Sequence, residues 1–363
     1  MSGFSKKIVR KISPFVPKWA KNNIPTGVKN FLRSKYVPRT VVIDIVGTCN
    51  LKCPSCPNGN TPNKNPIGMM DLVTFEKILD KIALEHPGTT VAIYNWTDQF
   101  LHPQIVDFIK VIHVHGLKSL LSSNLNFIPA DLKGLAESNS GGITISLSGF
   151  TQKVYGIAHK GGDIEIVKEN MRKLSAALKE ANSSTCVNVY YHKYKHNLDE
   201  IKLMEEFAKS LGFGFGADWA YFMPIEGVKK YIDGNLPEAD VKFIETNLAL
   251  NIKKAMEAAK EFKNEPCLFP STLLTIDWRG QVQLCCAVYD SGRFSIGSYL
   301  DTPWKVIEER LENHPFCKEC VKDSLHTYIS WHGNSKLRPI YQKIAQEEIQ
   351  KHNNNNGWQK KNL

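Results

Sequence analysis

The stretch VVIDIVGTCNLKCPSCPNG (residues 41–59) decides the fold. Residues 41–46 form a short run rich in β-branched side chains, which predicts a buried strand. The Pro- and Gly-rich loop that follows carries Cys49, Cys53 and Cys56 in a C-x3-C-x2-C arrangement. The chain therefore begins its first regular unit with a strand whose carboxyl end leads directly into a cluster of thiols.

Outward from this stretch, short β-branched runs alternate with helical patterns, which is typical of βα units and a parallel sheet. Six units are too few for a closed eight-stranded barrel. They predict an α/β fold with an open, partial (β/α)6 TIM-like barrel, whose chemistry lies at the carboxyl ends of the strands. The predicted strands cover residues 41–46, 90–95, 117–123, 142–148, 186–192 and 214–223.

The pattern changes after a long polar helix predicted near Glu238–Lys263. Two short strands over 272–286, joined by a turn at 277–280, predict a small cysteine-rich α+β domain without a large core of its own. The expected organisation is a basic N-terminal arm (1–40), the partial barrel (41–235), a linker helix (236–265), the cysteine-rich domain (266–335) and a C-terminal helix with a polar tail (336–363).

Charge is concentrated at the N-terminus of the 363-residue chain. The chain has 46 Lys and Arg against 36 Asp and Glu, and residues 1–40 contain ten of the basic residues and no acidic one. The remainder is formally neutral, which argues against a nucleic-acid groove across the body. The arm could bind an anionic membrane surface or an acidic partner, or it could be a solvated extension. The sequence lacks 18 consecutive apolar residues and a signal peptide, so a cytoplasmic location is expected.

Nine cysteines in a reducing compartment favour metal binding or catalysis over disulfides. Thiolates at the spacing of Cys49, Cys53 and Cys56 can hold three irons of a [4Fe–4S] cube and leave the fourth iron without a protein ligand. A structural zinc is less favoured, because zinc needs four ligands and no nearby His completes the set. Three free thiols on one loop are the least favoured interpretation.

This cysteine loop resembles that of the radical S-adenosylmethionine (radical SAM) superfamily, which follows the first strand of a partial (β/α)6 barrel. The resemblance implies that the open iron chelates S-adenosylmethionine. A reducing protein such as flavodoxin or ferredoxin would supply one electron. Cleavage would then give methionine and a 5′-deoxyadenosyl radical, which takes a hydrogen atom from the substrate.

The resemblance also implies cofactor contacts at the second strand, where the family has a GGE-like motif. Here the matching residues are Asn95, Trp96, Thr97 and Asp98. Asp98 would take the acidic role, and the carbonyls of Trp96 and Thr97 would accept the ammonium hydrogens. Ser55 stands where the family often has an aromatic residue.

The third and fourth strands end in polar residues that lie where the family contacts the ribose and the methionine carboxylate. These are Ser123, Asn124, Ser146 and Ser148. The alternative is that they only end strands through local hydrogen bonds. The loop after the fourth strand adds Tyr155, His159 and Lys160 as candidates to face the cofactor.

A second group of cysteines, Cys267, Cys285, Cys317 and Cys320, combines a C-x12-G-x4-C hairpin with a later C-x2-C pair. Convergence on one metal would explain how a domain with little core folds. The arrangement resembles the SPASM/twitch domain, which implies one fully ligated auxiliary [4Fe–4S] cluster. A four-cysteine structural zinc is the alternative.

A fully ligated cluster suits electron transfer. The leading hypothesis is an oxidoreductase that removes hydrogen from a small-molecule substrate such as a sugar or cyclitol and passes an electron to the auxiliary cluster. The sequence does not choose the general base, and the catalytic residues stay unknown. One alternative is a peptide maturase acting on a ribosomal precursor. Another is a non-catalytic zinc-binding interaction protein.

Overall fold

The computed structural model describes residues 39–263 and 265–355. Almost all of the predicted arm, and the tail from residue 356, lie outside the described residues. Within the described part of the chain, no helix combines the length and apolar character needed to cross a membrane.

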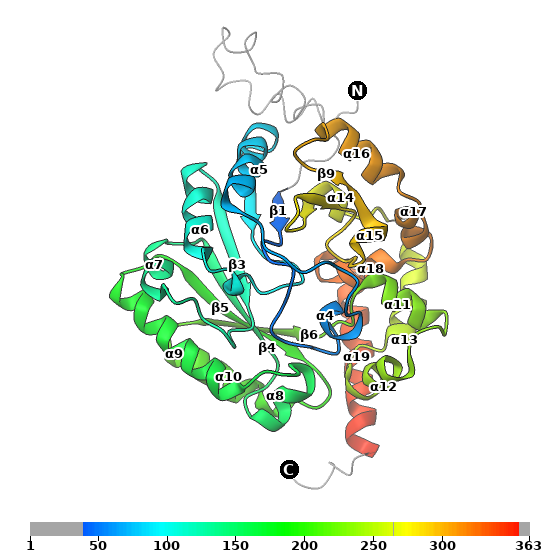
Figure 1. Ribbon diagram of the computed structural model, residues 1–363. Coiled ribbons are helices and arrows are strands. Elements are labelled where there is room, and N and C mark those ends of the chain that lie inside the picture. The colour runs from blue at the N-terminus through cyan, green and yellow to red at the C-terminus, as the bar shows by residue number, and fades with distance from the viewer. Residues whose placement is uncertain (1–38, 264, 356–363) are drawn as a thin grey trace, which may run out of the picture.

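One nine-stranded sheet organises the molecule, in the order β6-β5-β4-β3-β2-β1-β7-β8-β9 (Figure 1). Strands β1 to β6 are all parallel to their neighbours, as the repeated βα pattern predicts. The strands are β1 (Thr40–Ile43), β2 (Thr90–Ala92), β3 (Lys118–Ser123), β4 (Gly142–Leu147), β5 (Cys186–Lys193), β6 (Gly214–Trp219), β7 (Leu273–Ile276), β8 (Gln281–Gln283) and β9 (Ser295–Ser298).

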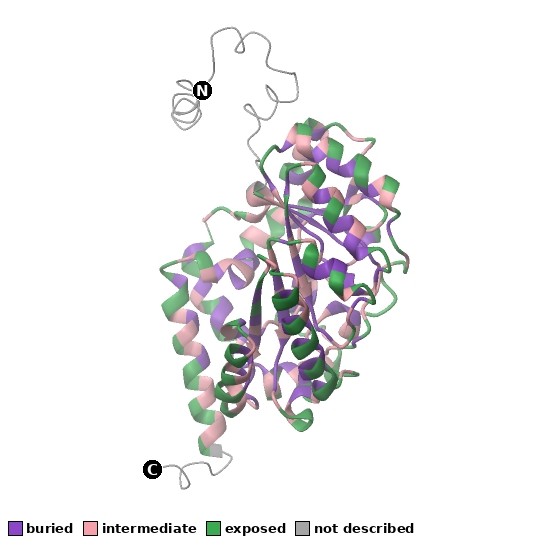
Figure 2. Ribbon diagram, turned by 90° about the vertical axis from the view of Figure 1, so that its left-hand side faces the viewer, coloured by how far each residue is buried: buried purple, intermediate pink, exposed green. Residues whose placement is uncertain are grey.

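Helices cover the outer face of the six parallel strands, and their apolar stripes explain this packing. The helix α5 (Leu72–Glu85) begins at Asp71, whose carboxylate accepts a hydrogen bond from the Thr74 amide. It buries Phe75, Ile78 and Leu79 against the sheet. Figure 2 shows the same division, with buried strands behind helices whose outer faces are exposed.

The other helices follow in chain order. Those associated with the barrel are α4 (Pro57–Asn60), η1 (Gln99–Leu101), α6 (Ile105–Val114), α7 (Leu132–Glu137), α8 (Gln152–Ala158), α9 (Ile164–Glu180), η2 (Leu198–Glu200) and α10 (Ile201–Ser210). The later ones are α11 (Ile225–Ile232), α12 (Glu238–Asn247), α13 (Ile252–Ala259), η3 (Lys260–Phe262), α14 (Phe269–Thr272), α15 (Ser291–Phe294), α16 (Trp304–Asn313), α17 (Pro315–Lys322), α18 (Leu325–Ser330), η4 (Trp331–Gly333) and α19 (Leu337–Asn355).

The predicted hairpin in the cysteine-rich region forms, but it is not a separate sheet. Strand β7 pairs in parallel with β1, with Val41 opposite Leu274, and β8 returns antiparallel to β7. The buried apolar residues of both regions form one continuous cluster. The cysteine-rich region thus shares the core of the barrel and lies beside the first strand, close to the cysteine loop. The domain boundaries remain a prediction.

The prediction of one long helix over 238–263 is wrong. Helix α12 ends at Asn247, and the chain is extended at Leu248. Residues 248–250 are buried, so this apolar run enters the core instead of continuing along the surface. Asn251 then starts α13 by accepting a hydrogen bond from the Lys254 amide.

Candidate functional site

A cavity opens at the carboxyl ends of the parallel strands, and we call it the first cavity. Its wall takes residues from the loops after β1 and β2, from the ends of β3 to β5, from the end of α8 and from the segment after β6. Of the residues singled out from the sequence, it is lined by Cys49, Cys53, Ser55, Cys56, Asn95, Trp96, Thr97, Asp98, Ser123, Asn124, Ser146 and His159.

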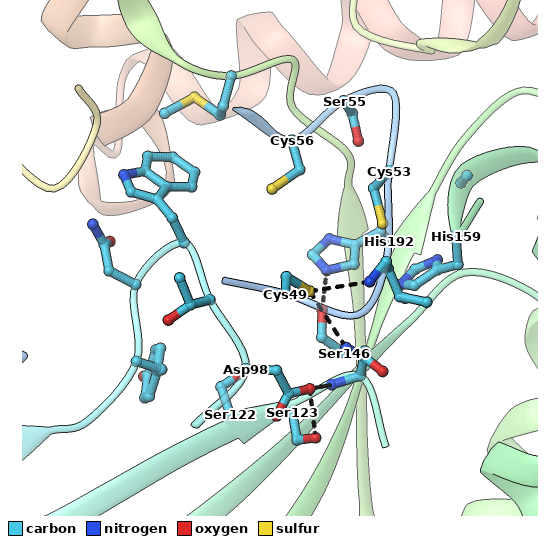
Figure 3. A pocket seen from close by; sticks show the side chains of 18 of the residues that line it. Cys49, Cys53, Ser55, Cys56, Asp98, Ser122, Ser123, Ser146, His159 and His192 are labelled. Atoms are coloured by element: carbon cyan, nitrogen blue, oxygen red, sulfur yellow. Dashed lines mark hydrogen bonds between the residues drawn. The ribbon is translucent and has the colours of Figure 1, made fainter. Parts of the chain in front are cut away.

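The three sulfurs of the β1 loop face the same space (Figure 3). The Cys56 amide donates to the Cys53 carbonyl at 3.0 Å, and Cys56 lies at the N-terminus of the short helix α4. A side chain at Gly59 would overlap the Cys53 carbonyl, which explains the glycine there. The fold thus arranges the loop so that its thiols converge.

Burial is the main influence on these thiols. It raises the pKa of Cys49 to about 12 and the pKa of Cys56 to about 11. Three half-buried thiolates side by side are costly without a cation to compensate them, and iron supplies that charge. The donor set and its burial therefore fit an iron–sulfur cluster held by Cys49, Cys53 and Cys56.

Asp44 organises the loop after β2, a role that sequence reasoning missed. Its Oδ1 accepts hydrogen bonds from the Asn95 amide at 2.9 Å and from Thr97 Oγ1 at 2.6 Å, and its Oδ2 accepts one from the Trp96 amide at 3.3 Å. Burial raises the pKa of Asp44 to about 6, although these donors oppose the shift. The only hint in the sequence was an acidic residue inside an otherwise apolar strand.

Asp98 reaches the first cavity, but both carboxylate oxygens accept hydrogen bonds from the protein. Oδ1 accepts from the Phe100 amide at 3.1 Å, and Oδ2 accepts from Ser123 Oγ at 2.8 Å and the Asn124 amide at 3.0 Å. Asp98 therefore ties the end of β2 to the end of β3. Its burial raises the pKa of Asp98 to about 6.

Asn58 is a second residue that the sequence reasoning missed. Its Nδ2 donates to the Trp96 carbonyl, which was predicted to bind the cofactor ammonium. A carbonyl oxygen has a second lone pair, so the bond to Asn58 orients this group and leaves one acceptor position. The Asn58 amides also lower the pKa of Cys56, against the larger effect of burial.

Two serines at the end of β4 pair with histidines, Ser146 with His192 on β5 and Ser148 with His159 at the end of α8. Ser146 Oγ lies 2.7 Å from His192 Nε2 in the cavity wall, as Figure 3 shows. Ser148 Oγ lies 2.7 Å from His159 Nδ1, but Ser148 is fully buried and does not line the cavity. Burial lowers the pKa of His192 to about 4 and that of His159 to about 3, so both rings are neutral near pH 7.

Two other predicted contacts differ from expectation. Tyr155 is fully buried, where it stacks on His159 with ring centroids 4.7 Å apart, and Lys160 is exposed outside the cavity wall. Near Ser55, the hydroxyl of Tyr194 lies 2.8 Å from Ser55 Oγ. An aromatic ring from the end of β5 thus occupies the wall beside the small residue of the cysteine loop.

The other four predicted cysteines also come together. Cys267, Cys285, Cys317 and Cys320 line one cavity, which we call the second cavity, with mainly apolar neighbours from α11, α14 and α17. Cys286 is not among its lining residues. Among the described residues, no three His, Cys, Asp or Glu side chains form a group that could hold a single metal ion.

Burial raises the pKa of Cys267 and of Cys317 to about 12. The four thiols fit a fully ligated iron–sulfur cluster, since such a cluster offers one iron to each thiolate. The apolar lining of the cavity would keep water away from it.

The fold is that of an open parallel barrel with its site at the carboxyl ends of the strands, as in α/β enzymes of the TIM type. Residues 43–208 match the family model described as the radical SAM superfamily; the match begins at the last residue of β1 and covers the cysteine loop and the strands β2 to β5. The match makes this part of the chain, a little under half of its length, similar to a radical SAM domain. No curated protein matches the sequence.

Solved structures with a similar fold include some with bound S-adenosylmethionine. The Streptococcus suis SuiB structure bound to S-adenosylmethionine is 15% identical, with a TM-score of 0.56 over 88% of this chain and 79% of that one. SuiB bound to precursor peptide SuiA gives 16% identity and a TM-score of 0.54, over 80% and 68% of the two chains. The protein anSMEcpe with bound AdoMet is 13% identical with a TM-score of 0.50, over 87% and 99%.

At these identities the likeness is one of fold. The family match adds support for radical SAM chemistry, which implies a [4Fe–4S] cluster and S-adenosylmethionine. The first cavity contains the three cysteines that such a cluster needs.

Proposed function

We propose that the chain is a radical SAM oxidoreductase that removes hydrogen from a small molecule, such as a sugar or cyclitol. The observation that carries the proposal is the pair of cysteine-lined cavities, one with three thiols and one with four. Three thiols leave one iron open for a cofactor, whereas four enclose a cluster that is suited to accepting an electron.

In this proposal Cys49, Cys53 and Cys56 hold the first cluster, and the loop Asn95–Asp98 binds S-adenosylmethionine. When bound, the cofactor would supply a 5′-deoxyadenosyl radical, which would abstract a hydrogen atom from the substrate. Asp44 and Asp98 keep the backbone of this loop and of the end of β3 in place. Asn124, Ser123 and Ser146 line the first cavity and would contact the ribose and the methionine carboxylate.

The second cavity would hold the auxiliary [4Fe–4S] cluster on Cys267, Cys285, Cys317 and Cys320. Its apolar lining would keep water from the cluster and so protect its redox state. A substrate that has lost a hydrogen atom can lose one proton and pass one electron to this cluster, which completes a two-electron oxidation. A reducing protein such as flavodoxin or ferredoxin would supply the electron that cleaves the cofactor.

His332 is the proposed proton acceptor. Its Nδ1 lies 3.0 Å from Asp218 Oδ2, so the carboxylate holds the proton on Nδ1 and leaves Nε2 as the basic nitrogen. This Nε2 is buried and has no hydrogen-bond partner among the described residues. His332 does not itself line the first cavity; its ring lies edge-on to that of Tyr221, with centroids 5.5 Å apart, and Tyr221 lines the cavity.

Peptide maturation is the second candidate, favoured by the fold shared with SuiB, whose structure was solved with a precursor peptide. A non-catalytic zinc-binding protein is the third. It predicts zinc in the purified protein and a colourless solution.

A substrate screen separates these candidates. Sugars, cyclitols and short peptides, each deuterated at carbon, are incubated with reduced protein and S-adenosylmethionine. We expect deuterium in 5′-deoxyadenosine only with a polyhydroxylated small molecule, and we expect His332→Gln to keep this transfer but lose the oxidised product. Deuterium transfer from peptides alone would favour the maturase, and zinc without iron would favour the interaction protein.

A further inference from the structure

The segment that follows Cys285 lines the second cavity and contacts a residue that lines the first. Ala287 and Val288 line the second cavity, and the Ala287 amide donates to Cys285 Sγ at 3.4 Å. The carbonyl of Val288 accepts a hydrogen bond from Trp96 Nε1 at 2.9 Å. Trp96 lines the first cavity. This hydrogen bond joins a residue in the wall of the second cavity to a residue in the wall of the first.

Tyr289 makes the second connection. Its hydroxyl donates to Asn58 Oδ1 at 3.3 Å, and Asn58 Nδ2 in turn donates to the Trp96 carbonyl. The rings of Tyr289 and Trp96 meet edge-on, with centroids 6.4 Å apart. Trp96 is therefore held at its indole by Val288 and at its carbonyl by Asn58, which is itself held by Tyr289.

Hydrogen bonds to neighbouring elements also hold the segment 285–291 in place, so that a shift at one cavity would be passed to the other. Asn65, between α4 and α5, donates from Nδ2 to the Tyr289 carbonyl at 2.6 Å and accepts from the Ser291 amide at 2.8 Å. On the other side, the Tyr289 amide donates to Glu226 Oε1 at 3.0 Å. These bonds leave the segment little freedom to move without moving the loops of the first cavity.

We infer that Val288 and Tyr289 are positioning residues for the S-adenosylmethionine site, and that occupation of the second cavity strengthens S-adenosylmethionine binding in the first. The inference rests on the proposed function, both for the S-adenosylmethionine site at Trp96 and for the occupation of the second cavity. Coupling between two sites is reciprocal and requires an element whose position both sites influence, and the segment 285–291 meets that requirement.

Tyr289→Phe is the clean test, because it removes one hydroxyl that is not part of the first cavity's wall. Tyr299→Phe is the matched control, since Tyr299 is a fully buried tyrosine whose hydroxyl donates to Glu85 Oε2 at 3.1 Å, away from the lining of both cavities. Full-length, anaerobically reconstituted, oxidised proteins are compared by equilibrium dialysis with labelled S-adenosylmethionine. We expect Tyr289→Phe to weaken binding about threefold to tenfold, as for one lost hydrogen bond, and Tyr299→Phe to leave it unchanged.

The coupling is tested by a double-mutant cycle with Cys317→Ala, which removes a thiol of the second cavity remote in sequence from the segment. We expect Cys317→Ala to weaken binding in the otherwise wild-type protein and to have a smaller effect in the Tyr289→Phe background. At saturating S-adenosylmethionine, the electron paramagnetic resonance (EPR) spectrum of the reduced first cluster in Tyr289→Phe and in Cys317→Ala should equal that of the wild type. A general loss of structure would change this spectrum.

An unchanged affinity in Tyr289→Phe overturns the positioning role, and equal effects of Cys317→Ala in both backgrounds overturn the coupling. Iron analysis keeps the proposed function separate. If the Cys49→Ala/Cys53→Ala/Cys56→Ala protein binds no iron, the auxiliary cluster is wrong, whereas the effect of Tyr289→Phe still decides the positioning role.

Discussion

Thr97 Oγ1 donates a hydrogen bond to Asp44 Oδ1 at 2.6 Å, which joins the end of β1 to the loop after β2. The same carboxylate accepts from the amides of Asn95 and Trp96. A loop without the glycines of the family motif therefore obtains its shape from a buried carboxylate on the neighbouring strand.

Removing that carboxylate tests its role. We expect Asp44→Ala to leave three donors without an acceptor and to lower the free energy of unfolding by about 3 kcal/mol, since each buried unpaired group costs about 1–3 kcal/mol. S-adenosylmethionine binding should weaken with it. Thermal unfolding and equilibrium dialysis measure the two effects, and Asp80→Ala, an exposed acid on α5, serves as the control. Wild-type affinity in a folded Asp44→Ala protein would contradict this role.

The same residue predicts a pH dependence of stability. Burial raises the pKa of Asp44 to about 6 in the folded protein, against 3.8 for the ordinary side chain. The folded state therefore takes up a proton before the unfolded state does, so the contribution of Asp44 to stability rises as the pH falls through 6. Relative to that of Asp44→Asn, the free energy of unfolding of the wild type should increase on the order of 1 kcal/mol as the pH falls from 7 to 5. A constant difference in unfolding free energy across this range would show that the pKa is not raised.

Iron content tests the second cavity. We expect Cys317→Ala to reduce the iron bound per chain from roughly eight to roughly four, because a thiol that encloses the auxiliary cluster is lost. Cys286→Ala is the matched control, since Cys286 is adjacent to Cys285 but lines neither cavity. It should keep the full iron content. If both variants kept eight irons, Cys317 would not be a ligand.

Loss of the auxiliary cluster should separate the two halves of the proposed reaction. We expect Cys317→Ala to retain some 5′-deoxyadenosine formation at high S-adenosylmethionine concentration, because the first cavity keeps its three thiols. The oxidised product should disappear, because the electron has no acceptor. Chromatography of both products measures the separation, and normal product formation by this variant would remove the auxiliary site from the mechanism.

Much of the fold could be predicted from local patterns. The six parallel strands follow from β-branched runs separated by amphipathic helices, and the cysteine loop after β1 follows from its spacing. The pairing of β7 with β1 could not be predicted, because a strand's partner depends on contacts far apart in sequence. The break at Leu248 was missed for a similar reason, since the core that receives residues 248–250 is built by other segments.

The site shows the same division. The cysteines were found because metal ligands recur at fixed spacings, and both sets line common cavities. Asp44, Asn58 and Tyr289 were missed, because each acts by bonding to a residue distant in sequence, and nothing in their local sequence indicates the partner. Ser148 was predicted to contact the cofactor, but it directly follows the end of β4 and is buried, where its hydroxyl lies 2.7 Å from His159 Nδ1.

The most direct test of the account is 5′-deoxyadenosine formation by anaerobically reconstituted protein, reduced in the presence of S-adenosylmethionine, for the wild type and for Cys53→Ala. The account predicts formation by the wild type and none by Cys53→Ala. If iron-loaded, reduced wild-type protein formed no 5′-deoxyadenosine, or if Cys53→Ala formed as much as the wild type, the assignment of the three thiols to a cluster that cleaves S-adenosylmethionine would be contradicted.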